Sequence, residues 1–330
     1  MQSRRVPILA AGVVVTILAA LGLVVAASGQ TPQPAASQPS TQPAIYDAMA
    51  DAKAQIAAAQ AKAGRENQRV LVMFGGNWCG WCRKLHGLFQ ENKDIARLLL
   101  YEYQLVLVDV GRFDKHMDVA AGYDIELKKA GVPFLTVLDA GGRVLANQET
   151  GALEKGDRHD PQKVTEFLNK WKAEPWDAEQ RLADALARAA AEQKLVFLHL
   201  GAPWCPWCRR LDAFLAQKES ADILGQDFMD LKIDVDRMKN GLAVAKRFRT
   251  SDKGGLPWFA FLDAKGQALA TSDGPAGNIG YPAAPEEISH FIGMLKKTAR
   301  RISEAQLARL EQALKDAAPK PTVPGAGGGG

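Results

Sequence analysis

The stretch Trp78-Cys79-Gly80-Trp81-Cys82 stands between an apolar run of strand length, residues 70–74, and a segment with helical periodicity. The pattern returns as Trp204-Cys205-Pro206-Trp207-Cys208. Matched cysteines, 79 with 205 and 82 with 208, are 126 residues apart in both cases. The two stretches hold all four cysteines, so the sequence predicts a repeated unit built around a pair of thiols.

Length and composition allow about two compact domains. The chain has 330 residues, of which 47% are apolar, enough for two cores of ordinary size. Its formal net charge of +4 comes from 41 Lys and Arg scattered among 37 Asp and Glu, without a long basic run. This distribution argues against a nucleic-acid partner. Because no cysteine lies outside the two pairs, the sequence shows neither a framework of structural disulfides nor a zinc-ribbon array.

The N-terminal residues 1–28 are typical of an export segment. Residues 6–27 carry no charged side chain and follow Arg4 and Arg5. A signal peptide has an apolar core of roughly 7 to 15 residues, whereas about 20 can span a bilayer, so the length favours an uncleaved membrane anchor. The small residues at 25–28 also suit signal-peptidase cleavage, and this alternative stays open. In either case we expect the rest of the chain to be exported across the cytoplasmic membrane, to the periplasm or another extracytoplasmic compartment.

Two other segments have compositions that cannot bury a core. Residues 29–44 are rich in Pro, Gln, Ala, Ser and Thr, which predicts a flexible linker. Residues 318–330 are rich in Pro and Gly, which predicts a disordered tail. Between these segments the sequence predicts one domain at 45–172, a second at 177–298, and an extra C-terminal helix at 299–317.

The two predicted domains repeat one order of elements. The first is expected to contain a helix from Ile45 to Gly64, strands at 70–74, 104–110, 134–138 and 143–146, and helices after Cys79, at 115–121 and from Pro161. The second is expected to contain a helix from Asp177, strands at 195–200, 228–235, 258–262 and 267–270, and helices after Cys205, at 242–248 and from Pro285. Ser303 and Gln306 form a capping box for the extra helix. This alternation indicates an α/β fold that occurs twice.

Two cysteines three residues apart at a helix start lie on roughly the same face, close enough to form a disulfide. Backbone N–H groups and the helix dipole stabilise a thiolate on the first cysteine. Cys79 and Cys205 are therefore the predicted nucleophiles, exposed to substrate, and Cys82 and Cys208 are the predicted resolving thiols. Nearby basic side chains are expected to add positive potential: Arg83, Lys84, Arg209 and Arg210. The alternative is a pair that binds a metal or is merely packed.

Each thiol pair is followed further along the chain by a proline at the start of a strand, in Gly131-Val132-Pro133-Phe134 and in Gly255-Leu256-Pro257-Trp258. This order, an apolar strand, the Trp-Cys-x-x-Cys motif, a helix and then the proline, resembles the thioredoxin superfamily. Because the order occurs twice after an export segment, the chain resembles a bacterial exported member with two tandem domains. The match covers about 45–172 and 177–298. The resemblance implies an α/β fold in which each domain has a central mixed sheet flanked by helices.

The resemblance also implies roles for the two prolines. Pro133 and Pro257 are expected to be cis, to pack against the thiols, and to leave the backbone of Val132 and Leu256 able to pair with an extended substrate. A cis X-Pro bond is uncommon without such a context. The alternative is an ordinary proline at the start of a strand.

Four tryptophans flank the thiols. Trp81 and Trp207 lie between the cysteines, so we expect them to be exposed and to contact substrate. Trp78 and Trp204 precede the first cysteines. They either form, with Trp81 and Trp207, an apolar lip around the thiols that receives the substrate chain, or they are partly packed core aromatics.

One departure from the family lies six residues before each first cysteine, where thioredoxins commonly carry a buried acid. Here the residues are Met73 and His199. Met73 cannot relay a proton, whereas His199 could do so near neutral pH or could be a hydrogen-bonded core residue.

A metal site is an alternative at the first pair, because His86 lies four residues after Cys82. Cys79, Cys82 and His86 could then approach one ion. The matching position in the second domain is Asp212, so such a site would exist only once.

The sequence therefore predicts an exported, membrane-tethered thiol–disulfide oxidoreductase that supports redox homeostasis by dithiol–disulfide exchange, with no cofactor besides its cysteines. Its expected partners are protein thiols and disulfides and an electron donor or acceptor in the membrane or the exported compartment. The tether would be residues 6–27. The alternative is a binding module without turnover, either a metal carrier or a client-holding protein.

Overall fold

The structure is a computed structural model that describes residues 43–249 and 255–318. The predicted export segment, the linker up to residue 42 and the tail from 319 onward lie outside the described residues. Within the described ranges, no helix is long and apolar enough to cross a membrane.

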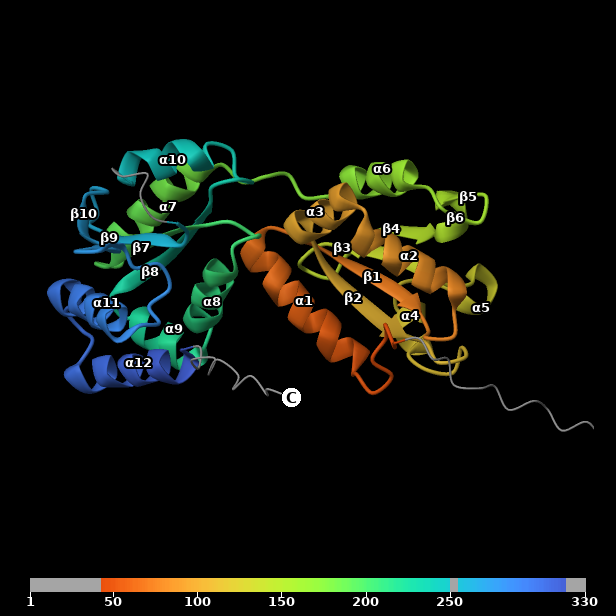
Figure 1. The fold of residues 1–330 in the computed structure, drawn as a ribbon, viewed down its shortest axis with the longest axis horizontal. Coiled ribbons are helices and arrows are strands. Elements are labelled where there is room, and N and C mark those ends of the chain that lie inside the picture. Colours follow the sequence, from red (N-terminus) through yellow and green to blue (C-terminus); the bar gives the residue numbers. More distant parts are fainter. Residues whose placement is uncertain (1–42, 250–254, 319–330) are drawn as a thin grey trace, which may run out of the picture. The chain divides into compact units, whose positions relative to one another are not determined.

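The first domain is built on a four-stranded sheet with the strand order β2-β1-β3-β4 (Figure 1). Strands β1 and β2 are parallel, whereas β3 is antiparallel to both β1 and β4. The strands are β1 (Arg69–Gly75), β2 (Tyr103–Asp109), β3 (Phe134–Leu138) and β4 (Val144–Glu149). The helices are α1 (Ala52–Glu66), α2 (Gly80–Glu91), α3 (Lys93–Glu102), α4 (Met117–Ala121), α5 (Leu127–Ala130) and α6 (Pro161–Trp171).

The second domain repeats this topology with the strand order β10-β9-β7-β8. Strands β7 and β8 are parallel, and β9 is antiparallel to β7 and β10. The strands are β7 (Leu195–Gly201), β8 (Phe228–Asp234), β9 (Trp258–Leu262) and β10 (Ala268–Thr271). The helices are α7 (Ala178–Ala191), α8 (Pro206–Leu215), α9 (Lys218–Leu224), α10 (Gly241–Phe248), α11 (Pro285–Thr298) and α12 (Glu304–Ala317). The predicted α/β fold with two mixed sheets flanked by helices is confirmed.

The sheet of each domain lies between two hydrophobic cores. Successive residues of a central strand point to opposite faces of the sheet, so alternate side chains belong to different cores. On β1, Leu71 and Met73 pack with α2, α3 and α6, whereas Val72 and Phe74 pack with α1 and α4. On β7, Phe197 packs with α8, α9, α11 and α12, and the alternate residues pack with α7 and α10. Each sheet is therefore buried on both faces, and each cysteine helix lies on the face of Met73 or Phe197.

The start of α1 differs from the prediction. The helix begins at Ala52 rather than at Ile45, because the Asp51 carboxylate caps it by accepting hydrogen bonds from Lys53 N and Ala54 N. Met49, which shares the helical spacing of Ile45 and Ile56 and was expected on the buried face of that helix, is 90% exposed. Residues 43–50 instead form a non-helical segment that contacts the first cysteine motif.

Smaller differences concern short elements. The helix predicted at 115–121 begins only at Met117, and α5 was not predicted. Two short hairpins were also missed, because two-residue strands have no periodicity to detect. They are β5 (Glu154–Lys155) with β6 (Arg158–His159), and β11 (Asp273–Gly274) with β12 (Gly277–Asn278). The 3-10 turn η1 (Thr150–Leu153) precedes the first hairpin.

Candidate active sites

Each cysteine pair lies at the N-terminus of a helix that follows the central strand of its sheet. Cys79 is the N-cap of α2, and its Sγ accepts a hydrogen bond from Cys82 N at 3.0 Å. Cys205 caps α8 in the same way, with Cys208 N at 3.1 Å. Both pairs form disulfides, with Cα atoms 5.2 and 5.3 Å apart. A thiolate on the first cysteine would receive the same backbone N–H and the helix dipole.

The predicted exposure of the first cysteines is wrong. Cys79 is 5% exposed and Cys205 only 2%. The proline loops cover them, since Cys79 Sγ lies 3.6 Å from Val132 O and Cys205 Sγ lies 3.3 Å from Leu256 O. In the disulfide form, therefore, little of either first cysteine is accessible to solvent.

Both predicted prolines follow cis peptide bonds, Val132-Pro133 and Leu256-Pro257. The carbonyl of Pro133 accepts a hydrogen bond from Thr150 Oγ1 at 2.7 Å, and the carbonyl of Pro257 accepts one from Asn278 Nδ2 at 2.9 Å. These contacts fix the loop beside each disulfide. The binding of an extended substrate by Val132 and Leu256 stays a prediction.

Three of the four tryptophans are well exposed, with 44% for Trp78, 54% for Trp204 and 42% for Trp207. Trp78 Nε1 donates to Gly111 O, and Trp204 Nε1 donates to Asp236 Oδ2 at 2.7 Å. These bonds hold each ring at the surface by its polar edge. For Trp78 and Trp204, the exposure favours the predicted lip over the core alternative.

Trp81 differs from its counterpart because it is half-buried. Its ring packs edge-on against His159 of β6, with centroids 5.3 Å apart, and Lys84 Nζ lies 4.5 Å from its centroid. Trp207 instead stacks on Tyr281 at 6.1 Å and has Arg210 at 5.0 Å. The expectation that Trp81 is exposed is therefore wrong, because the unpredicted β5–β6 hairpin partly covers it.

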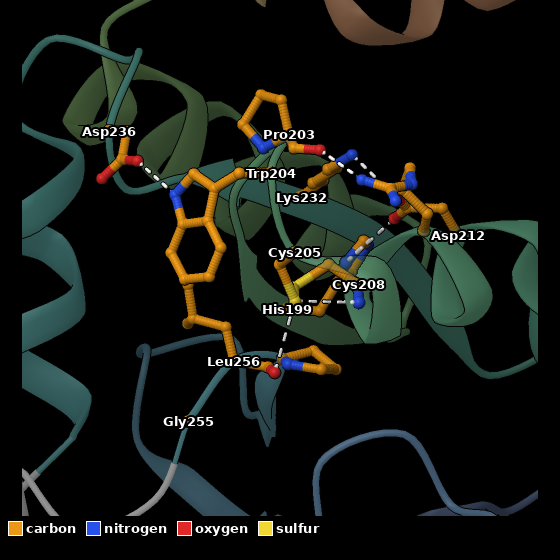
Figure 2. Close-up of a disulfide and its surroundings, with 12 residues drawn as sticks. His199, Pro203, Trp204, Cys205, Cys208, Asp212, Lys232, Asp236, Gly255 and Leu256 are labelled. Atoms are coloured by element: carbon orange, nitrogen blue, oxygen red, sulfur yellow. Dashed lines mark hydrogen bonds and ion pairs between the residues drawn. A yellow bond between two sulfur atoms is a disulfide. The ribbon is translucent and has the colours of Figure 1, made fainter. Parts of the chain in front are cut away.

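His199 is a buried member of a charged cluster in the second domain (Figure 2). Its Nε2 lies 2.9 Å from Asp230 Oδ1, and its Nδ1 lies 3.8 Å from Asp212 Oδ1. Lys232 Nζ donates to Asp212 Oδ2 at 2.7 Å. Burial alone would lower the pKa of His199, but the carboxylates of Asp230 and Asp212 outweigh it, so the pKa is raised.

The strand geometry places His199 against the cysteine helix. Phe197, His199 and Gly201 share one face of β7, and Phe197 packs on α8. A Cβ at Gly201 would lie 3.3 Å from Cys208 Cβ. His199 thus lies on the face of β7 that contacts Cys208, two residues before Gly201, where the contact is made. Its role as a proton relay stays a prediction.

Sequence reasoning missed both acidic partners of His199. Asp212 follows Cys208 by four residues, so helical periodicity could have placed it on the same face of the helix, one turn after the resolving cysteine. Asp230 could not have been found, because its position depends on the parallel register in which His199 pairs with Lys232.

The basic residues near the motifs mostly bond to carbonyl groups. Arg83 donates to Asn77 O and to Pro43 O, and Arg209 Nη1 donates to Pro203 O at 2.7 Å. Lys84 Nζ donates to Asp157 O. These side chains therefore hold loops around the disulfides as well as supplying positive charge.

The metal alternative has no support in the described ranges. There, no group of three or more His, Cys, Asp and Glu side chains is arranged to hold an ion. Cys79 and Cys82 are bonded to each other in a disulfide. Burial on α2 lowers the pKa of the His86 imidazole.

A mixed sheet with helices on both faces, a disulfide at the start of the helix after the central strand, and a cis proline beside it define a thioredoxin fold, which occurs here twice. A family model described as thioredoxin-like matches residues 51–140 and 177–264, more than half of the chain. The chain belongs to this thioredoxin-like family.

Several known proteins are similar to parts of the chain. Protein disulfide-isomerase tigA of Aspergillus niger is 25% identical over 214 residues, 60% of this chain and 52% of the relative. The chain thus spans about half the length of this curated relative. The disulphide isomerase of Xylella fastidiosa Temecula1 is 29% identical over 38% of this chain and 95% of its own, with a TM-score of 0.35. A thioredoxin from Thermus thermophilus is 20% identical over 34% of this chain and 80% of its own, with a TM-score of 0.27.

Proposed function

We propose that the chain is an exported thiol–disulfide oxidoreductase that exchanges disulfides with protein clients at both cysteine pairs. The observation that carries the proposal is the repeated geometry. In each domain the first sulfur caps a helix, is bonded to the second sulfur, and lies beside the carbonyl that precedes a cis proline. Dithiol–disulfide exchange needs a stabilised thiolate and a second thiol that can resolve the mixed disulfide, and this geometry places the two groups within reach of each other.

The proposed reaction is reversible exchange. In the reducing direction, the Cys79 thiolate attacks a client disulfide, forms a mixed disulfide and releases one client thiolate. Cys82 then attacks Cys79 Sγ as a thiolate, which forms the Cys79–Cys82 disulfide and releases the second client thiolate. Two electrons pass from the protein to the client, and Cys205 and Cys208 act in the same way. Run backwards, the same steps oxidise a client dithiol.

The partners follow from this chemistry. The relative named a protein disulfide-isomerase supports protein thiols and disulfides as clients. The exposed rings of Trp78, Trp204 and Trp207 beside the sulfurs offer an apolar surface for a polypeptide. Turnover also requires an electron donor or acceptor, which we place in the membrane or the exported compartment.

Export and a membrane tether are part of the proposal. They are supported by the uncharged residues 6–27 after Arg4 and Arg5. The test compares the full chain with a chain lacking residues 1–28 by cell fractionation. We expect the full chain in the membrane fraction, accessible to protease from the exported side, and the shortened chain in the cytoplasm. A full chain found in the cytoplasm would refute export.

A trapping experiment tests the activity. We expect Cys82→Ser and Cys208→Ser each to accumulate mixed disulfides with client proteins, because each variant keeps the nucleophile and loses the group that resolves the bond. The measurement is non-reducing electrophoresis after acid quenching, and the matched controls are Cys79→Ser and Cys205→Ser, which should trap nothing.

The outcome also separates the proposal from a binding module. Client binding that persists in Cys79→Ser and Cys205→Ser, with no trapped species in the other two variants, would show a client-holding protein without turnover.

A further inference from the structure

The segment that precedes α1 is fastened to the first cysteine motif. The Asn77 side chain accepts hydrogen bonds from Ile45 N and Tyr46 N at 2.8 and 3.0 Å, and its Nδ2 donates to Tyr46 O at 2.9 Å. Arg83 Nη1 donates to Pro43 O at 2.8 Å. Two residues next to the disulfide therefore fix the backbone at Tyr46.

This anchoring places the Tyr46 hydroxyl close to the resolving cysteine. The Tyr46 side chain is 2% exposed and belongs to the same core as Cys79, Cys82 and Met73. A Cβ built on Gly75 would lie 2.6 Å from Cys82 Sγ and closer still to the Tyr46 hydroxyl oxygen, so these two atoms are within about 5 Å of each other. The absence of a side chain at Gly75 makes this approach possible.

The hydroxyl has no hydrogen-bond partner among the described residues while the disulfide is formed. A buried hydroxyl without a partner is costly, so its position next to a reacting sulfur calls for a functional explanation. Burial, together with the charge of Asp109, raises the pKa of Tyr46, and Lys115 Nζ lies 3.9 Å from that carboxylate. The phenol therefore stays protonated, which makes it a hydrogen-bond donor and not a base.

We propose that, once the disulfide is reduced, the Tyr46 hydroxyl donates a hydrogen bond to the Cys82 thiolate and so stabilises the resolving nucleophile of the first site. Cys82 attacks Cys79 Sγ in the mixed disulfide, the Cys79–Cys82 bond forms, and the client leaves as a thiolate. The O–H bond of Tyr46 stays intact. Tyr46 thus stabilises the thiolate without relaying a proton, unlike the acid that is absent at Met73, and the inference rests on the proposed exchange reaction.

The second site has no equivalent group. A Cβ at Gly201 would meet only Cys208 atoms within 4 Å, and position 172, which matches Tyr46 through the repeat, is the exposed Lys172. The donor is therefore specific to the first site, and the second site is an internal control.

The test measures the pKa of Cys82 directly. In the full chain with Cys79→Ser, Cys205→Ser and Cys208→Ser, Cys82 is the single thiol, and its rate of alkylation against pH gives its pKa. Adding Tyr46→Phe should raise that pKa by about one to two units, the size expected for a lost hydrogen bond to a charged group. An unchanged pKa would overturn the proposal, and this readout does not depend on client exchange, which the trapping experiment tests separately.

A kinetic measurement follows the same change. Resolution of a mixed disulfide at Cys79 should slow by about three- to tenfold in Tyr46→Phe, because the smaller thiolate fraction is partly offset by the greater nucleophilicity of a more basic thiolate. Resolution at Cys205 should be unchanged. Equal slowing at both sites would contradict a role specific to Cys82.

Tyr103→Phe is the matched control for folding. Tyr103 is buried in the same core, but its hydroxyl already donates to Leu168 O at 2.6 Å. Tyr103→Phe should lower the melting temperature of the oxidised and reduced forms alike and leave the Cys82 pKa unchanged. Tyr46→Phe should lower the melting temperature of the reduced form only. An equal decrease in the melting temperature of both forms would indicate a merely structural role.

Discussion

Two buried histidines sit in opposite electrostatic environments. His159 lies under Trp81, its ring nitrogens have no hydrogen-bond partner among the described residues, and burial, with the charge of Lys84, lowers its pKa to about 4. His199 lies between two carboxylates that raise its pKa. Protonation therefore costs free energy at His159 and is favoured at His199.

These shifts predict opposite effects of pH on stability. As the pH falls, His159 is protonated at a higher pH in the unfolded chain than in the folded one. The free energy of unfolding therefore falls by up to about 3 kcal/mol as the pH drops from about 6.5 to 4. For His199 the folded chain binds the proton more tightly, so its contribution is present below about pH 6.5 and is lost as the pH rises through the folded pKa. The measurement is thermal unfolding of the oxidised protein from pH 4 to 9.

The two histidine variants serve as controls for each other. His159→Gln should flatten the loss of stability on the acid side, and His199→Gln should remove the loss on the alkaline side. Identical pH profiles for both variants and the unsubstituted protein would show that neither histidine controls stability.

At the scale of elements, one buried carboxylate holds the turn that leads from α11 into α12. Asp227 Oδ2 accepts hydrogen bonds from Arg300 N, Arg301 N and Ile302 N, at 3.1, 2.7 and 3.0 Å, and so shapes the turn between α11 and α12. Beyond this turn the predicted capping box is confirmed, because Ser303 and Gln306 bond reciprocally. The apolar face of α12 then packs into the core through Leu307, Leu310 and Leu314.

We expect Asp227→Ala to destabilise the second domain by about 3 kcal/mol, because it leaves three partly buried N–H groups without their acceptor. Urea unfolding measures the loss, and limited proteolysis should cut first between α11 and α12. Ser303→Ala, which removes only the helix cap, should cost about 1 kcal/mol. Equal losses in the two variants would show that the carboxylate does not hold the turn.

At the scale of the whole molecule, one topology carries two chemically different sites. The first has Gly80 between its cysteines, Met73 below them and Tyr46 beside the resolving sulfur. The second has Pro206 at the corresponding position and a cluster of ionisable groups around His199. Because such groups change the stability of thiolates, the two disulfides should differ in reduction potential.

We expect the two sites to differ by at least about 30 mV, which is a tenfold difference in the exchange equilibrium. The measurement is equilibration with glutathione of full-length chains in which one cysteine pair is replaced by serine, Cys79→Ser with Cys82→Ser or Cys205→Ser with Cys208→Ser. Equal potentials would contradict this expectation and would leave no driving force for electron transfer from one site to the other.

The repeat and the local patterns were enough to determine much of this protein. The apolar run at 70–74, the cysteine spacing and the 126-residue offset predicted the strands, the cysteine helices and the doubling of the fold. These features are local, because periodicity and caps act within a few residues of the chain. The cis geometry of Pro133 and Pro257 also followed from a short motif, through the family that it resembles.

The tertiary structure alone decided what surrounds each pair of sulfurs. Strand register set His199 beside Asp230, an unpredicted hairpin brought His159 against the Trp81 ring, and the non-helical segment 43–50 brought Tyr46 over Gly75 to Cys82. No periodicity encodes such contacts, because they join segments that become neighbours only when the chain folds. The sequence by itself therefore determined two dithiol sites on a repeated α/β fold, and the packing around them decided which polar side chains lie near each pair of sulfurs.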